Sequence, residues 1–138
     1  MQPFHLAIRV TDIKKTKDFY VNTLGCTIGR EAKKWVDFNM MGHQVSCHLF
    51  EELATNIDDC KNPVDGKKVP VPHFGVILTW EQWHDLAERI KDKVDFIIEP
   101  YTRFRGQAGE QGTMFFADPS GNVLEFKCFK DMNLIFEA

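Results

Sequence analysis

The feature that most constrains the fold is an internal repeat, which places a histidine at the same point of two similar segments. Residues 4–10 read Phe-His-Leu-Ala-Ile-Arg-Val, and residues 72–78 read Pro-His-Phe-Gly-Val-Ile-Leu. Each segment is typical of a short strand, and each is followed by a helical pattern. Each half also ends in a strand with another metal-ligand residue, His48 in the first and Glu125 in the second. The repeat therefore predicts two similar modules that share one metal ion.

The order of predicted elements in both halves is βαβββ. Asp12 is a suitable N-cap for a helix that ends at Gly25, and Thr79 with Gln82 has the spacing of a capping box for the second helix. We expect strands at 3–10, 26–30, 35–41 and 44–50 in the first half, and at 72–78, 95–99, 113–117 and 122–129 in the second.

Eight such strands with two helices predict an α+β fold, an eight-stranded, cupped and incompletely closed barrel with the helices outside. Its concave face would hold a ligand. We expect a single domain over 1–138, with module one at about 1–55, module two at about 71–138 and a linker at about 56–70. The linker region is rich in Asn, Asp, Pro and Gly, which favour turns.

Composition narrows the classes of function. The chain has 138 residues, 43% of them hydrophobic and 27% charged, with a net charge of −3. These values are ordinary for a globular domain and argue against nucleic acid as a partner, because phosphate binding needs clustered Lys and Arg. The sequence shows neither an apolar run long enough for a membrane nor a secretory signal. The four cysteines are scattered, so we expect reduced thiols and a cytoplasmic protein.

Strand alternation selects the residues that face the predicted cup. His5 shares a strand face with Ala7 and Arg9, opposite the apolar side chains that the helix must cover. By the same argument His73 and Glu125 point into the cup. A carboxylate on a half-buried strand is costly without a partner, and a divalent cation is one such partner, with Arg or Lys as the other. A lone strand histidine is often structural, whereas ligand-type residues in register with a repeat favour a metal.

His48 decides between two kinds of metal site. Two histidines and one carboxylate, His5, His73 and Glu125, are the ligand set of non-haem Fe(II) oxygenases, which keep positions open for substrate and dioxygen. With His48 as a fourth ligand, the metal would act as a Lewis acid. His48 can instead transfer protons beside the metal. The sequence leaves both roles open.

A long polar connection at 101–111 breaks the repeat. Tyr101, Arg103 and Arg105 are candidate substrate-binding residues, because guanidinium groups hold carboxylates and phenolates. The glycines of this segment allow the movement of a lid. A solvated surface loop is the alternative.

The sequence resembles the vicinal oxygen chelate superfamily, which includes glyoxalase I, fosfomycin and bleomycin resistance proteins, and extradiol dioxygenases. The markers are a strand His-Leu-Ala-Ile-Arg-Val at 5–10, Phe-Tyr-Val-Asn-Thr-Leu-Gly at 19–25, and Asp-Pro-Ser-Gly-Asn-Val-Leu-Glu at 118–125. The stretches 42–48 and 104–111 look most like small predicted extradiol-type dioxygenases. Ring-cleaving members usually carry a Tyr in the strand before the ligand Glu, and here 113–116 has none.

This resemblance implies a metal-dependent oxidoreductase that acts on a small substrate chelated through two oxygens. It makes His5, His73 and Glu125 the ligands of Fe(II) or Mn(II), with His48 catalytic, and it implies a homodimer. One alternative is a glyoxalase-type isomerase or lyase with Ni, Zn or Co and His48 as fourth ligand. The other is a metal-free protein that sequesters an aromatic compound.

Overall fold

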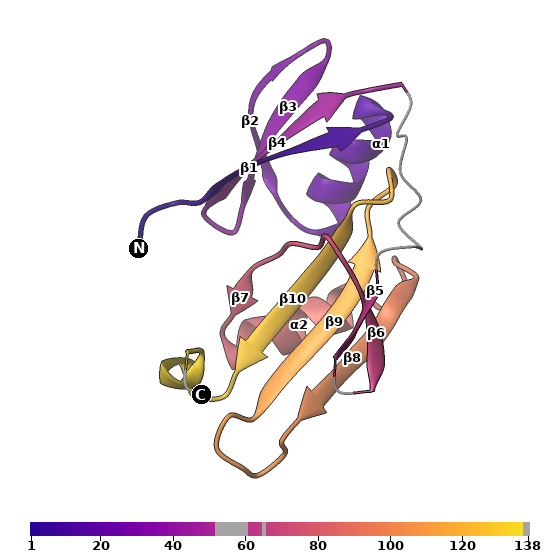
Figure 1. The fold of residues 1–138 in the computed structure, drawn as a ribbon. Helices are drawn as coiled ribbons and strands as arrows, with labels where there is room; N and C mark the ends of the chain where they lie inside the picture. The colour runs from indigo at the N-terminus through magenta and orange to yellow at the C-terminus, as the bar shows by residue number, and fades with distance from the viewer. Residues whose placement is uncertain (52–60, 65, 137–138) are drawn as a thin grey trace. The chain divides into compact units, whose positions relative to one another are not determined.

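The computed structural model describes residues 1–51, 61–64 and 66–136 (Figure 1). The chain divides into two compact units, and each is described by itself. Unit one comprises 1–71 together with 118–122, and unit two comprises 72–117 and 123–138.

Unit one contains the first βαβββ module. Its elements are β1 (His5–Val10), α1 (Ile13–Asp18), a π-helical turn (Phe19–Thr23), β2 (Thr27–Ala32), β3 (Trp35–Met40) and β4 (His43–Leu49). The sheet order is β1-β4-β3-β2, with β1 parallel to β4 and the other pairs antiparallel. The predicted strands of this half are therefore confirmed to within a few residues.

Local sequence explains how these elements begin and end. The Asp12 side chain accepts a hydrogen bond from the Lys15 backbone N–H at 2.9 Å and caps α1, as predicted. The β3–β4 turn is formed by Met41 and Gly42, both with positive φ (53° and 92°). Positive φ at both central residues is the geometry of a type I′ hairpin.

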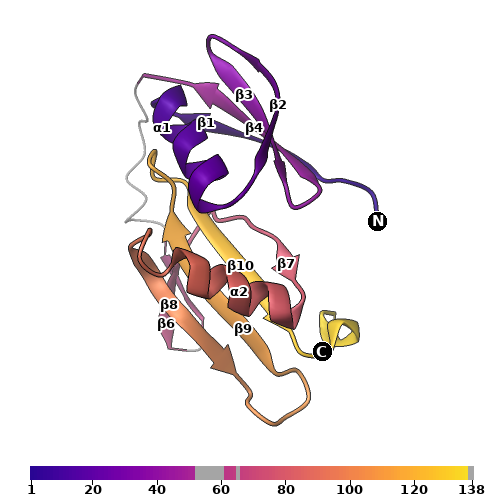
Figure 2. The ribbon, with the colours of Figure 1, turned by 180° about the vertical axis from the view of Figure 1, so that it is seen from behind.

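One face of the first sheet carries the apolar core beneath α1, seen from behind in Figure 2. Val36, Phe38, Val45 and Cys47 are at most 2% exposed on this face. The residues that alternate with them form the opposite face, which we call the open face of unit one. This alternation is the period-two pattern that the sequence predicts.

Unit two contains the second module. Its elements are β7 (Ile77–Leu78), α2 (Trp80–Ile90), β8 (Phe96–Arg103), β9 (Gln111–Ala117), β10 (Val123–Phe129) and a 3₁₀ turn (Met132–Leu134). The sheet order is β7-β10-β9-β8, with β7 parallel to β10. The α+β class with two βαβββ modules is confirmed. The eight strands form two separate four-stranded sheets among the described residues, rather than one hydrogen-bonded sheet.

The second helix covers the core of unit two. The predicted capping box is present, since Thr79 Oγ1 accepts from the Gln82 N–H and the Gln82 side chain accepts from the Thr79 N–H. Trp83 is 3% exposed and donates its indole N–H to the Phe126 carbonyl at 2.8 Å. The helix therefore fixes which face of β10 is core and which is open.

Two boundaries in unit two differ from the sequence prediction. The expected strand at 72–78 is reduced to Ile77–Leu78 and an isolated bridge between Phe74 and Leu124. β8 continues to Arg103, so Tyr101 and Arg103 lie in a strand and the connecting loop covers only 104–110.

The predicted linker contains ordered structure in its second part. β5 (Lys61–Val64) and β6 (Lys67–Pro70) form an antiparallel hairpin. The first part of the linker, to residue 60, lies outside the described residues. None of the described helices has the length and apolarity to cross a membrane.

Residues 118–122, the turn between β9 and β10, belong to unit one. The buried Tyr20 hydroxyl donates to Asp118 at 3.1 Å, and the Asn122 side chain donates to the Arg9 carbonyl at 2.9 Å. Burial raises the pKa of the Asp118 carboxyl, although hydrogen bonds from Asn122, Ser120 and Tyr20 act in the opposite direction. Burial and Asp118 likewise raise the pKa of the Tyr20 phenol.

Candidate functional site

The open face of unit one presents His5 at the end of a chain of polar contacts. The His5 Nδ1 atom lies 2.8 Å from Gln44 Oε1. Gln44 donates through Nε2 to Asp37 Oδ2 at 3.2 Å, and the Ser46 hydroxyl donates to Asp37 Oδ1 at 2.5 Å. His5 pairs with Gln44 across β1 and β4, and Asp37 pairs with Ser46 across β3 and β4, so sheet register places all four on one face.

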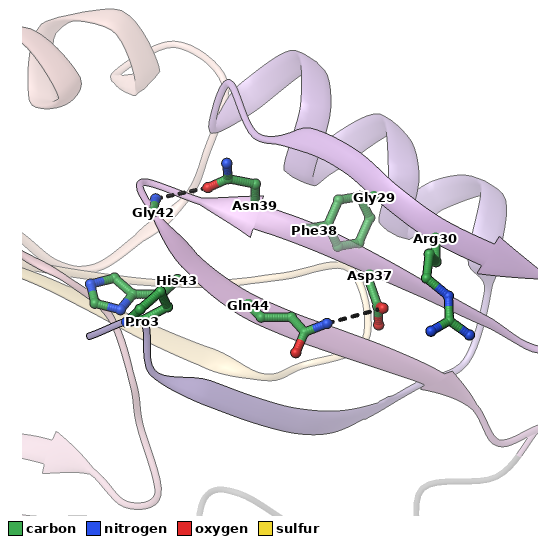
Figure 3. A pocket seen from close by; sticks show the side chains of 9 residues that line it. All are labelled: Pro3, Gly29, Arg30, Asp37, Phe38, Asn39, Gly42, His43 and Gln44. Atoms are coloured by element: carbon green, nitrogen blue, oxygen red, sulfur yellow. Dashed lines mark hydrogen bonds between the residues drawn. The ribbon is translucent and has the colours of Figure 1, made fainter. Parts of the chain in front are cut away.

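A cavity of about 300 Å³ adjoins this chain of contacts (Figure 3). Residues from β2, β3 and β4 line it, including Arg30, Asp37 and Gln44. His43 is half-buried in the wall of the cavity and accepts a hydrogen bond from the Phe4 N–H at 3.0 Å. The cavity contacts the chain of polar side chains at Asp37 and Gln44.

His48 lies on the same open face as His5 but far along the strand. It is exposed and pairs with Arg9 and Trp35, whereas His5 pairs with Gln44. His48 lies four positions beyond Gln44 along β4, which is about 13 Å at the usual rise. Within unit one, His5 and His48 are therefore too far apart to share a metal without large deviations of both side chains.

Unit two brings two of the predicted ligands together. His73 Nε2 lies 3.0 Å from Glu125 Oε2, with the two side chains 27% and 14% exposed. The His73 ring also packs edge-on against Phe115, with ring centroids 5.0 Å apart. Strand alternation on β10 puts Glu125 on the face opposite α2, which is the open face of unit two.

Neighbouring side chains on this face hold the Glu125 carboxylate. The buried Thr113 hydroxyl donates to Glu125 Oε1 at 2.6 Å, and Lys127 Nζ lies 3.9 Å from the same oxygen. Tyr101 pairs with Thr113 across β8 and β9. Burial, and then the negative charge of Glu125, raise the pKa of the Tyr101 phenol, which keeps it protonated. A tyrosine thus lies near Glu125 although the preceding strand contains none.

Gly75 explains the irregular strand before α2. A Cβ atom at this position would lie 1.7 Å from the Glu125 carbonyl oxygen and 2.7 Å from its carbonyl carbon. The backbone of residue 75 therefore presses against β10 at the ligand residue itself. The space that a side chain would need at this position is taken by the backbone of β10.

The other two predicted substrate-binding residues are Arg103 and Arg105. Arg103 lies over the Phe104 ring at 4.9 Å, and Arg105 lines a hollow between α2 and β8. The loop is also held rather than loose, because Glu110 Oε2 accepts from the Gly106 N–H at 3.1 Å and from Lys130 at 3.0 Å. These contacts lower the pKa of Glu110.

The pairing registers show which residues correspond in the two modules. Phe74 pairs with Leu124 and Ile77 with Lys127, whereas His5 pairs with Gln44 and Ala7 with Ser46. When the strands of His5 and His73 are superposed, Ser46 corresponds to Glu125. His48 corresponds to Lys127.

Unit two contains a pair of side chains that could ligate a cation. Across the described part of the chain, no three His, Cys, Asp or Glu side chains form a metal-binding group. Within unit two, however, an imidazole and a tethered carboxylate lie at hydrogen-bond distance, and both are common ligands of divalent metals. The donor chemistry therefore fits the metal that the sequence predicts.

The sequence prediction did not include the residues that support the candidate ligands. Gln44, Asp37 and Ser46 support His5, and Thr113 supports Glu125. Their only signal is position, since each has a polar side chain at an open-face place in a strand. Pairing register, which the sequence does not give, is needed to see that they are neighbours.

Two βαβββ modules, each presenting a potential ligand on the face opposite its helix, define a paired-module protein of the glyoxalase type. The sequence model of the Glyoxalase/Bleomycin resistance protein/Dioxygenase superfamily matches residues 2–126, and the chain belongs to this family.

Solved structures with the same fold are found in the same family. A glyoxalase/bleomycin resistance protein/dioxygenase from Alicyclobacillus acidocaldarius is 30% identical, with a TM-score of 0.78 and coverage of 98% of this chain and 96% of that one. A glyoxalase/dioxygenase from Nostoc punctiforme (19% identical, TM-score 0.66, coverage 94% and 92%) shares the fold. So does the fosfomycin resistance protein FosX from Listeria monocytogenes (19%, 0.64, 93% and 93%). No curated protein sequence matches the chain.

Proposed function

We propose that the protein is a metal-dependent enzyme in which His5, His73 and Glu125 hold one divalent cation. The observation that carries this proposal is the pairing of His73 with Glu125 at 3.0 Å on an open sheet face. The carboxylate is mostly buried and held by Thr113, so its position is fixed before a ligand arrives. His5 joins the set because it occupies the place of His73 in the repeat.

The proposed site has three protein ligands rather than four. Ser46, not His48, corresponds to Glu125 in the pairing register, and a serine hydroxyl is a poor ligand for transition metals. Two histidines and one carboxylate leave open coordination positions, the arrangement typical of Fe(II) oxygenases. This register supports Fe(II) or Mn(II) over the four-ligand isomerase.

We further propose extradiol-type cleavage of a small aromatic diol. A bound cation would supply the chelation of two substrate oxygens and a place for dioxygen, both atoms of which enter the ring-opened product. Tyr101, kept neutral by its raised pKa, donates a hydrogen bond to a substrate oxygen. His48, exposed on the open face of unit one, is the proposed residue for proton transfer.

Metal binding is tested first, by titrating the metal-free protein with Mn(II) and Fe(II) under anaerobic conditions. We expect one ion per chain. His5→Ala, His73→Ala and Glu125→Gln should each weaken binding by more than the roughly 10- to 100-fold typical of supporting residues. His84→Ala, which changes an exposed histidine on α2, is the matched control and should bind normally. Unchanged binding by the three variants would refute the ligand set.

Activity is tested by oxygen uptake with a panel of catechols and Fe(II)-loaded protein. His48→Gln should keep the metal and lose turnover, whereas a fourth ligand would lose metal as well. Metal binding with isomerisation of a hemithioacetal, and no oxygen uptake, would instead identify a glyoxalase-type enzyme. Tight binding of an aromatic compound without metal would identify a sequestering protein.

We also propose a homodimer, as the family resemblance implies. Light scattering of the purified protein at several concentrations tests it, and a mass of one chain throughout would refute it.

A further inference from the structure

We propose that Gln44 and Asp37 are positioning residues that fix the tautomer of His5, with the proton on Nδ1 and the Nε2 lone pair free for a cation. The inference rests on the proposed function for its purpose, since it concerns one of the proposed ligands. It is argued from a chain of hydrogen bonds in which the carboxylate of Asp37 determines, contact by contact, which atom donates and which accepts.

Asp37 lies at the far end of the chain of contacts from His5. Its Oδ1 atom accepts a hydrogen bond from the buried Ser46 hydroxyl at 2.5 Å, which fixes the carboxylate against the sheet. An ionised carboxylate accepts hydrogen bonds and donates none. The Gln44 atom that lies 3.2 Å from Asp37 Oδ2 is therefore the amide nitrogen, and Figure 3 shows the two side chains pointing toward each other.

The other end of the Gln44 amide lies at His5. With its nitrogen on Asp37, Gln44 turns its oxygen toward His5 Nδ1 at 2.8 Å. An amide oxygen only accepts, so Nδ1 must donate and must carry a hydrogen. A neutral imidazole has one N–H, which leaves Nε2 unprotonated.

The hydrogen bonds run in the direction that a metal-binding histidine needs, with the ring N–H donating away from the metal-binding nitrogen. Such histidines usually donate the ring N–H that is not at the metal to a carboxylate or a carbonyl, which fixes ring orientation and raises ligand basicity. Here the carboxylate of Asp37 acts through the amide of Gln44. In an isolated imidazole both tautomers are populated, so losing the chain should mix them.

The experiment is nitrogen-15 NMR of the metal-free protein, with the His5 signals assigned by their loss in His5→Ala. In the wild type we expect a protonated shift for Nδ1 and an unprotonated shift for Nε2 at a pH where the ring is neutral. Gln44→Met removes the acceptor at similar side-chain length and should give mixed tautomers. Gln107→Met makes the same change on the exposed loop of unit two and should leave His5 unchanged.

A double variant distinguishes loss of the hydrogen-bond chain from a general effect of substitution at these positions. Asp37→Asn with Gln44→Glu keeps the chain with the amide and the carboxylate exchanged. The amide introduced at position 37 can donate to the carboxylate introduced at position 44, and that carboxylate can accept from Nδ1. We expect the double variant to restore the wild-type tautomer. Mn(II) affinity should fall about 10- to 100-fold in Gln44→Met and recover in the double variant.

The outcomes are separable. A wild-type His5 with its proton on Nε2, or with mixed tautomers, overturns the inference, and so does a Gln44→Met variant whose tautomer does not change. If His5→Ala binds Mn(II) as tightly as wild type, the proposed ligand set fails, while the NMR result still decides whether the hydrogen-bond chain exists.

Discussion

The two open sheet faces carry the same topology and different chemistry. In unit one, His5 pairs with Gln44, and an amide, a carboxylate and a hydroxyl extend away from it. In unit two, His73 lies directly against the carboxylate of Glu125, which takes the place that Ser46 has in unit one. One module therefore offers a single imidazole with support, and the other offers an imidazole and a carboxylate together.

This difference shows how two modules of the same topology can carry different donor groups on equivalent strands. The two modules differ at one equivalent strand position, Ser46 against Glu125, while the strand order stays the same. The backbone also differs at this position. In unit two Gly75 lies against the Glu125 carbonyl, whereas in unit one the equivalent residue is Ala7, which pairs with Ser46.

The largest expected effect is at Gly75. A Cβ there would overlap the Glu125 carbonyl, so Gly75→Ala must displace β10 and should reduce the free energy of unfolding by about 3 kcal/mol. Gly29→Ala in unit one is the control, because its Cβ would meet no atom closer than 3.5 Å, and we expect a change within about 0.5 kcal/mol. Urea denaturation measures both. Equal stability of the two variants would contradict the close approach at Gly75.

Removing the hydroxyl that supports each carboxylate should have the next largest effect. Thr113→Val leaves Glu125 Oε1 without its donor and should cost about 2 kcal/mol, with Mn(II) affinity lowered about 10-fold. Ser46→Ala, which removes the donor to Asp37, should cost about 1.5 kcal/mol, because Gln44 still donates to that carboxylate. Denaturation and metal titration measure the pair. If Ser46→Ala proves the more damaging to metal binding, the assignment of the carboxylate ligand to unit two is wrong.

A smaller effect is expected on the pH dependence of stability, from Asp118 in the turn at 118–122. The pKa of Asp118 is raised above its usual 3.8, mainly by burial. At a pH between 3.8 and the raised pKa of the folded state, Asp118 is protonated more in the folded protein than in the unfolded chain. The contribution of Asp118 to the free energy of unfolding therefore rises as the pH falls from the raised pKa toward 3.8. Asp118→Asn removes the titration.

The free energies of unfolding of wild type and Asp118→Asn, measured against pH, test this sign. The difference between wild type and variant should shift in favour of wild type as the pH approaches 3.8. A shift in the opposite direction would mean that hydrogen bonds outweigh burial at Asp118.

The smallest effect compares the thiols on the helix side of the two candidate ligand strands. Burial raises the pKa of Cys128 on β10 to about 11, and raises that of Cys47 on β4 still further. Since the thiolate is the reactive form, both should alkylate slowly at pH 8, with Cys47 the slower. Peptide-resolved mass spectrometry after timed labelling measures the rates. Rapid labelling of either cysteine would place it outside the core.

The sequence predicts best those features that depend on local chemistry. Asp12 and Thr79 cap the helices as expected, and strand alternation correctly puts His5 and Glu125 opposite the apolar face. The strand at 72–78 is overestimated because the close contact of Gly75 with β10 is a tertiary effect. The sequence names Tyr101 as a candidate but does not place it near Glu125, because Tyr101 comes from β8, two strands away from β10 in the sheet.

The supporting residues could not be found without register. Gln44 and Asp37 are separated by a hairpin, and only strand pairing shows that they and His5 form one chain of contacts. The same register moves the position equivalent to Glu125 from His48 to Ser46, a shift of two residues that a pattern of ligand types does not reveal.

The most direct test of the proposed ligand set is anomalous diffraction from crystals grown with Mn(II). We predict one peak per chain, contacted by imidazole nitrogens of His5 and His73 and by the carboxylate of Glu125, with His48 outside the coordination shell. A peak coordinated by His48, or one that touches neither His73 nor Glu125, would contradict it.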